Sequence, residues 1–317
     1  MSEPASPASR RIAFWGTPEV AVPALEGFVR APDFEVAAVV TNPDRPKGRS
    51  RTPVAPPVKE AALRHDLEVW QPERPREILD RLRALDLDAS AVVAYGAILP
   101  ADVLAASGAG FVNLHFSLLP RWRGAAPVQH AIRAGDSTTG VTTFVLDEGM
   151  DTGPILEQEE VRIRPDETAG DLLHRLAEIG APILVDSLRR WLDGMEPVPQ
   201  PTEGATIASK IDRDDVAIDW EASADEVANL VRSANPAPGA HTSFRGDPLK
   251  VWGATPMPDA TADAPGTVVR TESDGPVIAT GEGAVRLDEV QPAGKSRMRG
   301  GDFVNGYQPD VGERLGA

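Results

Sequence analysis

The chain has 317 residues, of which 41% are hydrophobic and 25% are charged, and its formal net charge at pH 7 is -16. This composition excludes a largely disordered protein, and the absence of cysteine excludes a disulfide framework and any thiolate metal site. The acidic charge argues against general attraction to nucleic acid or to an anionic membrane, although a local basic patch can still attract an anion at short range.

The length favours about two domains of roughly 150 residues each. Residues 1–9 lack the apolar stretch of a signal peptide, and we expect them to form a disordered tail. We find no apolar run of about 18 residues, the length that a membrane-spanning helix needs, so we expect a cytoplasmic protein.

Short apolar runs separated by amphipathic segments make up the first part of the chain. Residues 11–15 (RIAFW) and 36–41 (VAAVVT) are strand candidates, and residues 18–30 between them have apolar side chains at roughly helical spacing. Near-continuous apolar strands joined by helices are typical of a parallel sheet covered on both faces. The alternation continues with helix candidates at 58–65 and 76–85 and strand candidates at 67–70, 91–95 and 111–116.

The next part of the chain extends the same sheet. Residues 140–147 and 155–163 alternate apolar and polar, which favours more exposed, antiparallel strands. A long helix is expected over about 167–193, with Pro182 as a point where it kinks or splits. The order of elements predicts an α/β domain over 10–195 with an open doubly wound, mostly parallel (Rossmann-like) sheet.

The composition changes after this domain. Residues 196–212 are rich in proline and small polar residues, which is typical of an interdomain linker. A helix is expected over 224–235, with Ser223 as its N-cap. Short β-like segments with Gly- and Pro-rich turns then favour a smaller, OB-like β-barrel domain over 213–317. These segments are 249–253, 266–270, 276–280 and 284–290.

Two candidate loops follow the first two strands. Gly16-Thr17-Pro18 does not complete a G-x-G-x-x-G motif, so Gly16 is interpreted as a tight strand-to-helix turn and nicotinamide chemistry is disfavoured. The loop 41–51 leaves the carboxyl end of a strand, where open α/β folds bind ligands, and it is a candidate contact for an anionic partner. Its basic residues are Arg45, Lys47, Arg49 and Arg51.

A chemical pair is expected on the strand 111–116. Residues two apart on a strand share one face, so Asn113 and His115 project together near its carboxyl end. The segment 146–156 adds three carboxylates, namely Asp147, Glu148 and Asp151. An amide donor for an oxyanion, an imidazole that moves protons and a carboxylate that orients the imidazole make up an acyl-transfer set.

Other chemistries have little support in the sequence. The five histidines show no metal-ligand spacing, so no metal site is expected. The chain has neither cysteine nor a G-x-S-x-G motif, and Ser117 is interpreted as a turn-capping hydroxyl rather than a nucleophile.

At these residues the sequence resembles the folate-dependent formyltransferase family, and within it the branch that acts on methionyl-tRNA. The resemblance covers about residues 10 to 312, and RWRGAAP (121–127) together with a C-terminal barrel is typical of that branch. The other motifs that carry it are FWGTP (14–18), TNPDRPKGR (41–49), VVAYGAILP (92–100), NLHFSLLP (113–120), LDEGMDTGPIL (146–156) and VQPAGKSRM (290–298).

The resemblance implies a reaction and three catalytic residues. The α-amine of methionine esterified to initiator tRNA would attack the formyl carbon of 10-formyltetrahydrofolate and give N-formylmethionyl-tRNA for translation initiation. Asn113 would donate to the oxyanion of the tetrahedral intermediate. His115 would help to stabilise that charge and move a proton, while Asp151 would hold the imidazole and assist proton transfer.

The resemblance also implies two binding surfaces. The folate would lie against two loops, at Val93, Ala94, Tyr95, Gly96, Ile98, Leu99, Ser117, Leu118, Leu119 and Pro120. The initiator tRNA would contact basic residues of the loop 41–51 and of the C-terminal domain, namely Arg45, Lys47, Arg49, Arg51, Lys250, Lys295 and Arg297.

Two rival functions stay open. One is a folate-dependent formyltransferase with another acceptor, a sugar nucleotide or a purine precursor. The other is a catalytically silent RNA-binding paralogue. Beyond the tRNA and the tetrahydrofolate derivative, we expect no metal and no membrane partner, and we expect a monomer.

Overall fold

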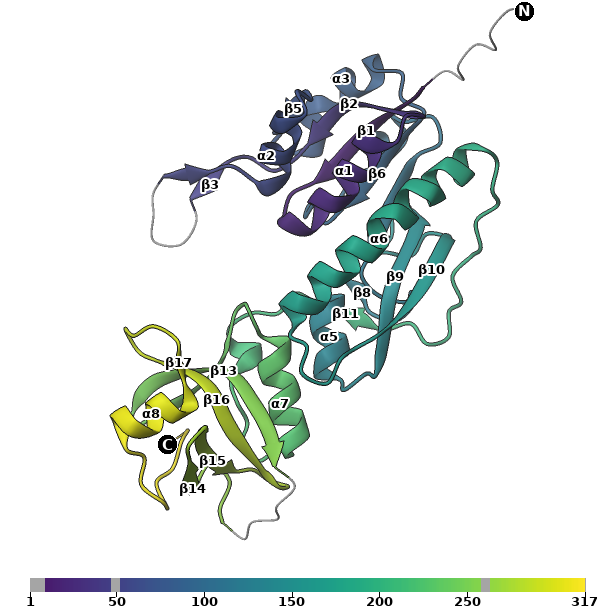
Figure 1. The fold of residues 1–317 in the computed structure, drawn as a ribbon. Coiled ribbons are helices and arrows are strands. Elements are labelled where there is room, and N and C mark those ends of the chain that lie inside the picture. The colour runs from purple at the N-terminus through teal and green to yellow at the C-terminus, as the bar shows by residue number, and fades with distance from the viewer. Residues whose placement is uncertain (1–8, 47–51, 258–262, 317) are drawn as a thin grey trace, which may run out of the picture. The chain divides into compact units, whose positions relative to one another are not determined.

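The computed structural model describes residues 9–46, 52–257 and 263–316. The chain forms two compact units, each assembled from separate stretches of sequence (Figure 1). Unit 1 consists of Met1–Ala125, Thr139–Val161 and Leu173–Ala208, and unit 2 consists of Ala126–Thr138, Arg162–Leu172 and Ser209–Ala317. Unit 1 therefore includes much of the proline-rich segment that the composition assigns to a linker.

The described part of unit 1 is built on a seven-stranded sheet. Its strands are β1 (Arg10–Gly16), β2 (Phe34–Val40), β5 (Val69–Trp70), β6 (Ala89–Val93), β7 (Phe111–His115), β9 (Thr138–Val145) and β10 (Ile155–Arg162), in the order β10-β9-β7-β6-β1-β2-β5. β1 pairs in parallel with β2 and β6, and the pairs β2–β5 and β6–β7 are also parallel. β9 is antiparallel to its neighbour β7. The edge strand β10 also runs antiparallel to β9, since the Val145 N–H donates to the Pro154 carbonyl at one end and the Ile163 N–H to the Ser137 carbonyl at the other. The predicted open, doubly wound, mostly parallel sheet is confirmed.

Helices cover both faces of this sheet. On one face, Phe28 of α1 (Val22–Arg30) packs on Phe14, and Gly180 of α6 (Ala169–Leu192) lies so close to Leu114 that an added Cβ would be 2.8 Å from its side chain. On the other face, α3 (Leu79–Ala84) and α4 (Ala101–Leu104) pack on a buried cluster that includes Trp15 and Phe111. Alternate residues of β7 therefore face different helices: Phe111 faces the α3 and α4 side of the sheet, and Leu114 faces α6.

Several predicted elements differ in detail from the observed ones. α6 continues through Pro182 as one helix, so of the two predicted alternatives, a kink or a split, the split is wrong. β9 is buried along most of its length because it lies inside the sheet, whereas β10 at the edge exposes residues 158–160. The expected helix over 76–85 begins as a 3₁₀ turn, η2 (Pro75–Ile78), before α3. The helix expected over 58–65 is α2 (Pro57–Arg64).

Further short elements have no counterpart among the predicted ones. The 3₁₀ turn η1 (Glu19–Ala21) lies in the segment 18–30 that was expected to be helical, directly before α1. The elements without a counterpart are β3 (Arg45–Pro46), β4 (Pro53–Val54), α4, β8 (Arg123–Gly124), α5 (Pro127–Arg133), β11 (Ile207–Ala208), η3 (Asp214–Val216), β12 (Ala240–Phe244), β17 (Met298–Arg299) and α8 (Gly300–Tyr307). Most are two to five residues long, which is too short for a hydrophobic period to show.

Unit 2 is centred on an antiparallel sheet. The strands β13 (Asp247–Met257), β14 (Val268–Glu272), β15 (Gly275–Ala279) and β16 (Ala284–Pro292) join β12 in the order β12-β13-β16-β15-β14, with β17 paired to β16. The C-terminal segment after α8 pairs with both edges of this sheet. Leu315 pairs with Phe244 of β12, and Arg314 pairs with Thr267, which directly precedes β14. This arrangement closes the sheet on itself and agrees with the predicted small β-barrel domain.

One helix of unit 2 contributes to its apolar core. α7 (Ala224–Ser233) begins at the predicted N-cap, where Ser223 and Glu226 form a reciprocal capping box. Its apolar face joins the core beneath the sheet. Arg232 near its end donates hydrogen bonds to the backbone carbonyls of Arg164 and Glu167, at 3.3 and 3.2 Å. These contacts attach a stretch of chain from the middle of the sequence to the C-terminal part.

No helix within the described ranges is both long enough and apolar enough to cross a membrane.

Candidate active site

Asn113 and His115 lie at the carboxyl end of β7, on the sheet face opposite to α6. Asn113 is in register with Val92 of β6, which is in register with Trp15 of β1, whereas Leu114 faces Gly180 of α6. Residues two apart on a strand share a face, so Asn113 and His115 both belong to the Trp15 side. β7 ends at His115, one residue earlier than predicted, and Phe116 lies beyond the strand.

The His115 ring is held between a carboxylate and a backbone carbonyl. Its Nδ1 atom is 3.6 Å from Oδ2 of Asp151, and its Nε2 atom is 2.8 Å from the carbonyl oxygen of Trp122. A carbonyl only accepts hydrogen bonds, so in this contact Nε2 carries the hydrogen and Nδ1 is the ring nitrogen that faces the carboxylate. Only 7% of the His115 side chain and 18% of the Asp151 side chain are exposed, which limits the access of water to this pair.

The loop after β9 distinguishes Asp151 from the other two candidate carboxylates. Asp147 accepts hydrogen bonds from the Thr152 hydroxyl at 2.8 Å and from the Gly149 N–H at 3.0 Å, so it stabilises the turn itself. Glu148 is exposed. Asp151, in a left-handed conformation with φ 54°, instead accepts a hydrogen bond from the Gly124 N–H at 2.7 Å. The fold therefore brings one carboxylate of the three to the imidazole.

Asn113 completes the group. Its residue is half-buried, and no other group in the described part of the chain hydrogen-bonds to its side-chain amide. A half-buried amide whose donors are not used within the protein is available to an oxygen of a bound molecule.

The loop after β6, expected to contact the folate, has an unusual backbone. Ala94 and Gly96 have positive φ values of 46° and 85°, and the Tyr95 carbonyl accepts hydrogen bonds from Thr17 Oγ1 at 3.0 Å and Asn42 Nδ2 at 3.1 Å. Burial raises the pKa of the Tyr95 hydroxyl to about 12, with a smaller contribution from the negative charge of Glu77. The loop is thus tied to the segments that follow β1 and β2.

The remaining residues of this loop differ in exposure. Val93 ends β6 and is buried, Leu99 is buried, and Ile98 is 90% exposed. An isoleucine that is so exposed beside a candidate site is a surface on which an apolar ring can pack.

The loop after β7 is anchored by its backbone. The Ser117 hydroxyl donates to the Arg121 carbonyl at 2.6 Å, in line with the predicted turn-capping role. The Leu119 N–H donates to the Thr142 hydroxyl at 3.1 Å, and its carbonyl accepts from Gln158 at 2.8 Å. Leu118 packs against Gly140, where an added Cβ would be 2.5 Å from its side chain, and Pro120 follows directly. These contacts position the loop beside His115.

Two residues of the site have no signal in the sequence. Gln200 and Thr206, in the predicted linker, make hydrogen bonds with the segment Trp122–Gly124 and with the loop of Asp151. β11 pairs in parallel with β8 over the same stretch. The proline-rich composition of this segment resembles that of a linker, and each of these contacts joins residues far apart along the chain. Neither composition nor local spacing therefore predicts them.

The residues expected to contact tRNA fall into three groups. Arg45 begins β3 and forms an exposed ion pair with Glu73 at 2.8 Å. Lys47, Arg49 and Arg51 lie outside the described residues. In unit 2, the Arg297 guanidinium stacks on the Trp252 ring at 3.5 Å and the Lys250 ammonium lies 5.2 Å from the same ring, while Lys295 is exposed. Arg297 also forms an ion pair with Glu289 at 3.7 Å, so part of the positive charge around Trp252 is neutralised within unit 2.

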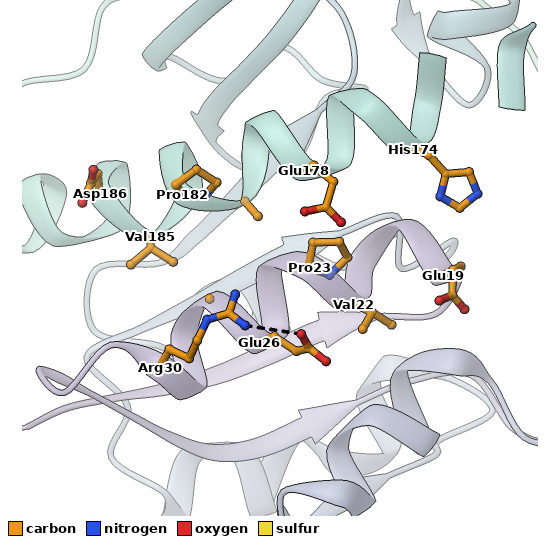
Figure 2. Close-up of a pocket in the computed structure, with 12 residues that line it drawn as sticks. Glu19, Val22, Pro23, Glu26, Arg30, His174, Glu178, Pro182, Val185 and Asp186 are labelled. Atoms are coloured by element: carbon orange, nitrogen blue, oxygen red, sulfur yellow. Dashed lines mark hydrogen bonds and ion pairs between the residues drawn. The ribbon is translucent and has the colours of Figure 1, made fainter. Parts of the chain in front are cut away.

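A separate groove lies between α1 and α6, with a volume of about 590 Å³ (Figure 2). Carboxylates line much of it, and one of them, Glu26, pairs with Arg30 at 3.4 Å. Since α1 and α6 cover the Leu114 side of the sheet, this groove is on the other face from Asn113 and His115. Among the described residues, no group of three or more His, Asp or Glu side chains is arranged to hold a metal ion.

An amide, an imidazole and a carboxylate at one strand end of a Rossmann-like sheet are the components of an acyl-group transferase, and comparison with known proteins agrees. Residues 10–188 match the formyl transferase family, and residues 210–308 match the formyl transferase C-terminal domain. The first of these matches covers more than half of the chain.

Within that class, the chain belongs to the methionyl-tRNA formyltransferase family. It is 48% identical to the methionyl-tRNA formyltransferase of Streptomyces coelicolor over 96% of this chain and 99% of that protein. It is 49% identical to the enzyme of the same name from Streptomyces griseus, with the same coverage. Among solved structures, an N-formyltransferase from Helicobacter canadensis, in complex with folinic acid and dTDP-3-aminofucose, shares the fold with a TM-score of 0.67 at 18% identity, over 88% of this chain and 99% of that one.

Proposed function

We propose that this protein transfers the formyl group of 10-formyltetrahydrofolate to the α-amino group of methionyl-initiator-tRNA. Similarity to methionyl-tRNA formyltransferases along almost the whole chain supports the choice of acceptor. The observation that carries the chemistry is the buried His115–Asp151 pair, 3.6 Å apart, on the same sheet face as Asn113.

In the proposed reaction, the amine nitrogen attacks the formyl carbon and the carbonyl oxygen becomes an oxyanion. The Asn113 amide donates a hydrogen bond to that oxyanion, and His115 adds a second stabilising contact once its Nδ1 atom has taken up a proton. The nitrogen must lose a proton as the new C–N bond forms, and the N10 atom of tetrahydrofolate must gain one as the old C–N bond breaks. His115 Nδ1, beside Asp151, is the group that relays this proton.

The binding residues are part of the proposal. The loop 93–99 and the loop 117–120 flank the catalytic strand end, so the folate lies between them, with the exposed Ile98 against its ring system. Arg45 contacts the acceptor end of the tRNA, and Lys250, Lys295 and Arg297 of the C-terminal domain contact its phosphate backbone. For Arg45 this requires exchange of its ion pair with Glu73, which costs little because both side chains are mostly exposed.

The rival acceptors have weaker support. The Helicobacter canadensis sugar-nucleotide complex has the same fold, so the fold alone does not decide between a sugar nucleotide and a tRNA. The C-terminal formyl transferase domain and the 48% identity to enzymes named for methionyl-tRNA favour tRNA. A silent RNA-binding paralogue would have no need of a buried imidazole–carboxylate pair, and its RNA affinity would be opposed by the net charge of -16.

A formylation assay tests the proposal. Purified protein with 10-formyltetrahydrofolate is offered initiator methionyl-tRNA, elongator methionyl-tRNA and an amino-sugar nucleotide in parallel. We expect turnover with the initiator tRNA and loss of at least about a hundredfold in rate for His115→Ala. Faster formylation of the amino-sugar nucleotide, or substantial turnover by His115→Ala, would contradict the proposed acceptor or the proposed role of the imidazole.

A further inference from the structure

The segment from Gln200 to Ala208 is hydrogen-bonded to the backbone and side chains that hold His115 and Asp151. His115 Nε2 is hydrogen-bonded to the carbonyl of Trp122, and Asp151 Oδ2 to the N–H of Gly124. Both of these partners belong to the three-residue stretch Trp122–Gly124. Whatever fixes this stretch also fixes the orientation of the imidazole and of the carboxylate.

Thr206 holds the Trp122 end of the stretch. Its hydroxyl oxygen accepts a hydrogen bond from the Trp122 N–H at 2.8 Å, and its backbone carbonyl accepts one from the Arg123 N–H at 2.9 Å. Trp122 has φ 62°, a left-handed conformation that a bulky residue adopts only where neighbouring groups impose it. The two contacts with Thr206 supply that constraint, and the Trp122 carbonyl consequently faces His115.

Gln200 holds the other end. Its Oε1 accepts hydrogen bonds from Arg123 Nε and an Arg123 terminal nitrogen, at 3.0 and 2.6 Å. Its Nε2 donates to the carbonyls of Asp151 and Gly153, at 2.9 and 2.7 Å. One side-chain amide therefore connects the stretch that holds His115 to the loop that carries Asp151, and both of its amide hydrogens are used.

We propose that Gln200 and Thr206 are positioning residues, which maintain the Nε2–H tautomer of His115 and its distance from Asp151. The hydrogen bonds of the two side chains go to Trp122, Arg123, Asp151 and Gly153 and not to His115, so each acts through Trp122–Gly124 or through the Asp151 loop. The catalytic consequence rests on the proposed formyl transfer, whereas the effect on the ring does not depend on which acceptor the enzyme uses.

Nitrogen-15 NMR of the histidine rings is the first test. The His115 signals are assigned by their loss in His115→Ala, and we expect the wild-type neutral ring to be in the Nε2–H form. Thr206→Val removes the acceptor at nearly constant shape, so a detectable fraction of the Nδ1–H form, or averaging of the two ring nitrogens, is expected. Thr206→Ser keeps a hydroxyl and should restore the wild-type spectrum.

Steady-state kinetics are the second test. We expect Thr206→Val and Gln200→Glu, which loses the amide donors but keeps its acceptors, to lower kcat about tenfold while both KM values change less than about twofold. Thr202→Val is the matched control, since Thr202 is exposed in the same segment and should behave as wild type. Circular dichroism and thermal unfolding establish that each variant is folded.

The outcomes separate the two proposals. A wild-type His115 in the Nδ1–H form, or an unchanged ring spectrum in both Thr206→Val and Gln200→Glu, would overturn the positioning role. Wild-type protein with the expected ring spectrum but without formylation of methionyl-tRNA would instead overturn the proposed function and leave the positioning role intact.

Discussion

Gly124 is the residue at which the pairing of β8 with β11 can be tested most directly. A Cβ added to Gly124 would be 2.7 Å from the carbonyl oxygen of Ala208, and its φ of +118° is a conformation that other residues rarely adopt. The Gly124→Ala variant must therefore move the two strands apart by roughly half an ångström, or change its backbone conformation. Either response disturbs the hydrogen bond from the Gly124 N–H to Asp151, now 2.7 Å long.

The expected size of the effect follows from these two contributions. A non-glycine residue in such a conformation costs about 1–3 kcal/mol, and the steric conflict adds to that. For a unit of this size, 1 kcal/mol lowers Tm by about 2–4 °C, so we expect a decrease of about 5 °C or more. The loss of the contact to Asp151 should also lower kcat by at least about tenfold.

Gly204 provides a matched control for this substitution. It also has a positive φ, +78°, but no atom lies within 4 Å of the position that a Cβ would take. Gly204→Ala therefore has the conformational cost, about 1 kcal/mol, without the steric conflict or the contact to the site. Thermal unfolding and formylation rates are measured for both variants. Equal losses of stability, with an unchanged kcat for Gly124→Ala, would refute the close packing of β8 on β11 as a constraint on the site.

Three other predictions concern the site, the basic loop and the stability of unit 1. Asn113→Ala should lower kcat by about 10²–10³ with little change in stability, as measured by single-turnover formylation; a loss below tenfold would exclude Asn113 as an oxyanion donor. Arg45→Ala should raise the KM for tRNA but not for the folate, and this KM should rise steeply with salt in the wild-type protein because phosphate contacts release counterions; equal effects on both substrates would contradict the loop assignment. Arg189→Met should lower Tm at neutral pH, because the hydrogen bond from Arg189 holds the pKa of Asp33 below its ordinary value of 3.8. A carboxyl group with a lowered pKa stabilises the fold above its ordinary value of 3.8 and loses this contribution as the pH falls from there through its folded-state pKa, so the difference in Tm should shrink progressively; a difference that stays constant across the acid range would show that packing, not charge, is responsible.

Local patterns account for the parts of the site and fold that could be predicted. The two-residue period of a strand was enough to place Asn113 and His115 on one face. The N-cap of α7 was predicted from Ser223, and Glu226 three residues later completes the capping box. The apolar runs of β1, β2, β6 and β7 predicted a parallel sheet because such strands are covered on both faces.

Contacts between distant segments could not be predicted in the same way. Three carboxylates in one loop looked equivalent from their spacing, and only the left-handed backbone of Asp151 selects the one that faces His115. Gln200 and Thr206 lie in a segment that resembles a linker in composition, and their partners are 47 to 84 residues away in the sequence. α8 begins with two glycines and has another near its end, so its helical pattern is weak.

Unit 2 is built from three separate stretches of the chain, and this limits how such a protein can be cut into fragments or recombined with a relative. Residues 162–172 lie in the middle of the chain, yet the Arg164 and Glu167 carbonyls accept hydrogen bonds from Arg232 of α7. No single cut after residue 208 would release unit 2 whole, because two of its three stretches would stay with the other fragment. When the C-terminal part is exchanged between relatives, folded chimaeras should therefore be obtained more often if residues 126–138 and 162–172 are exchanged together with it.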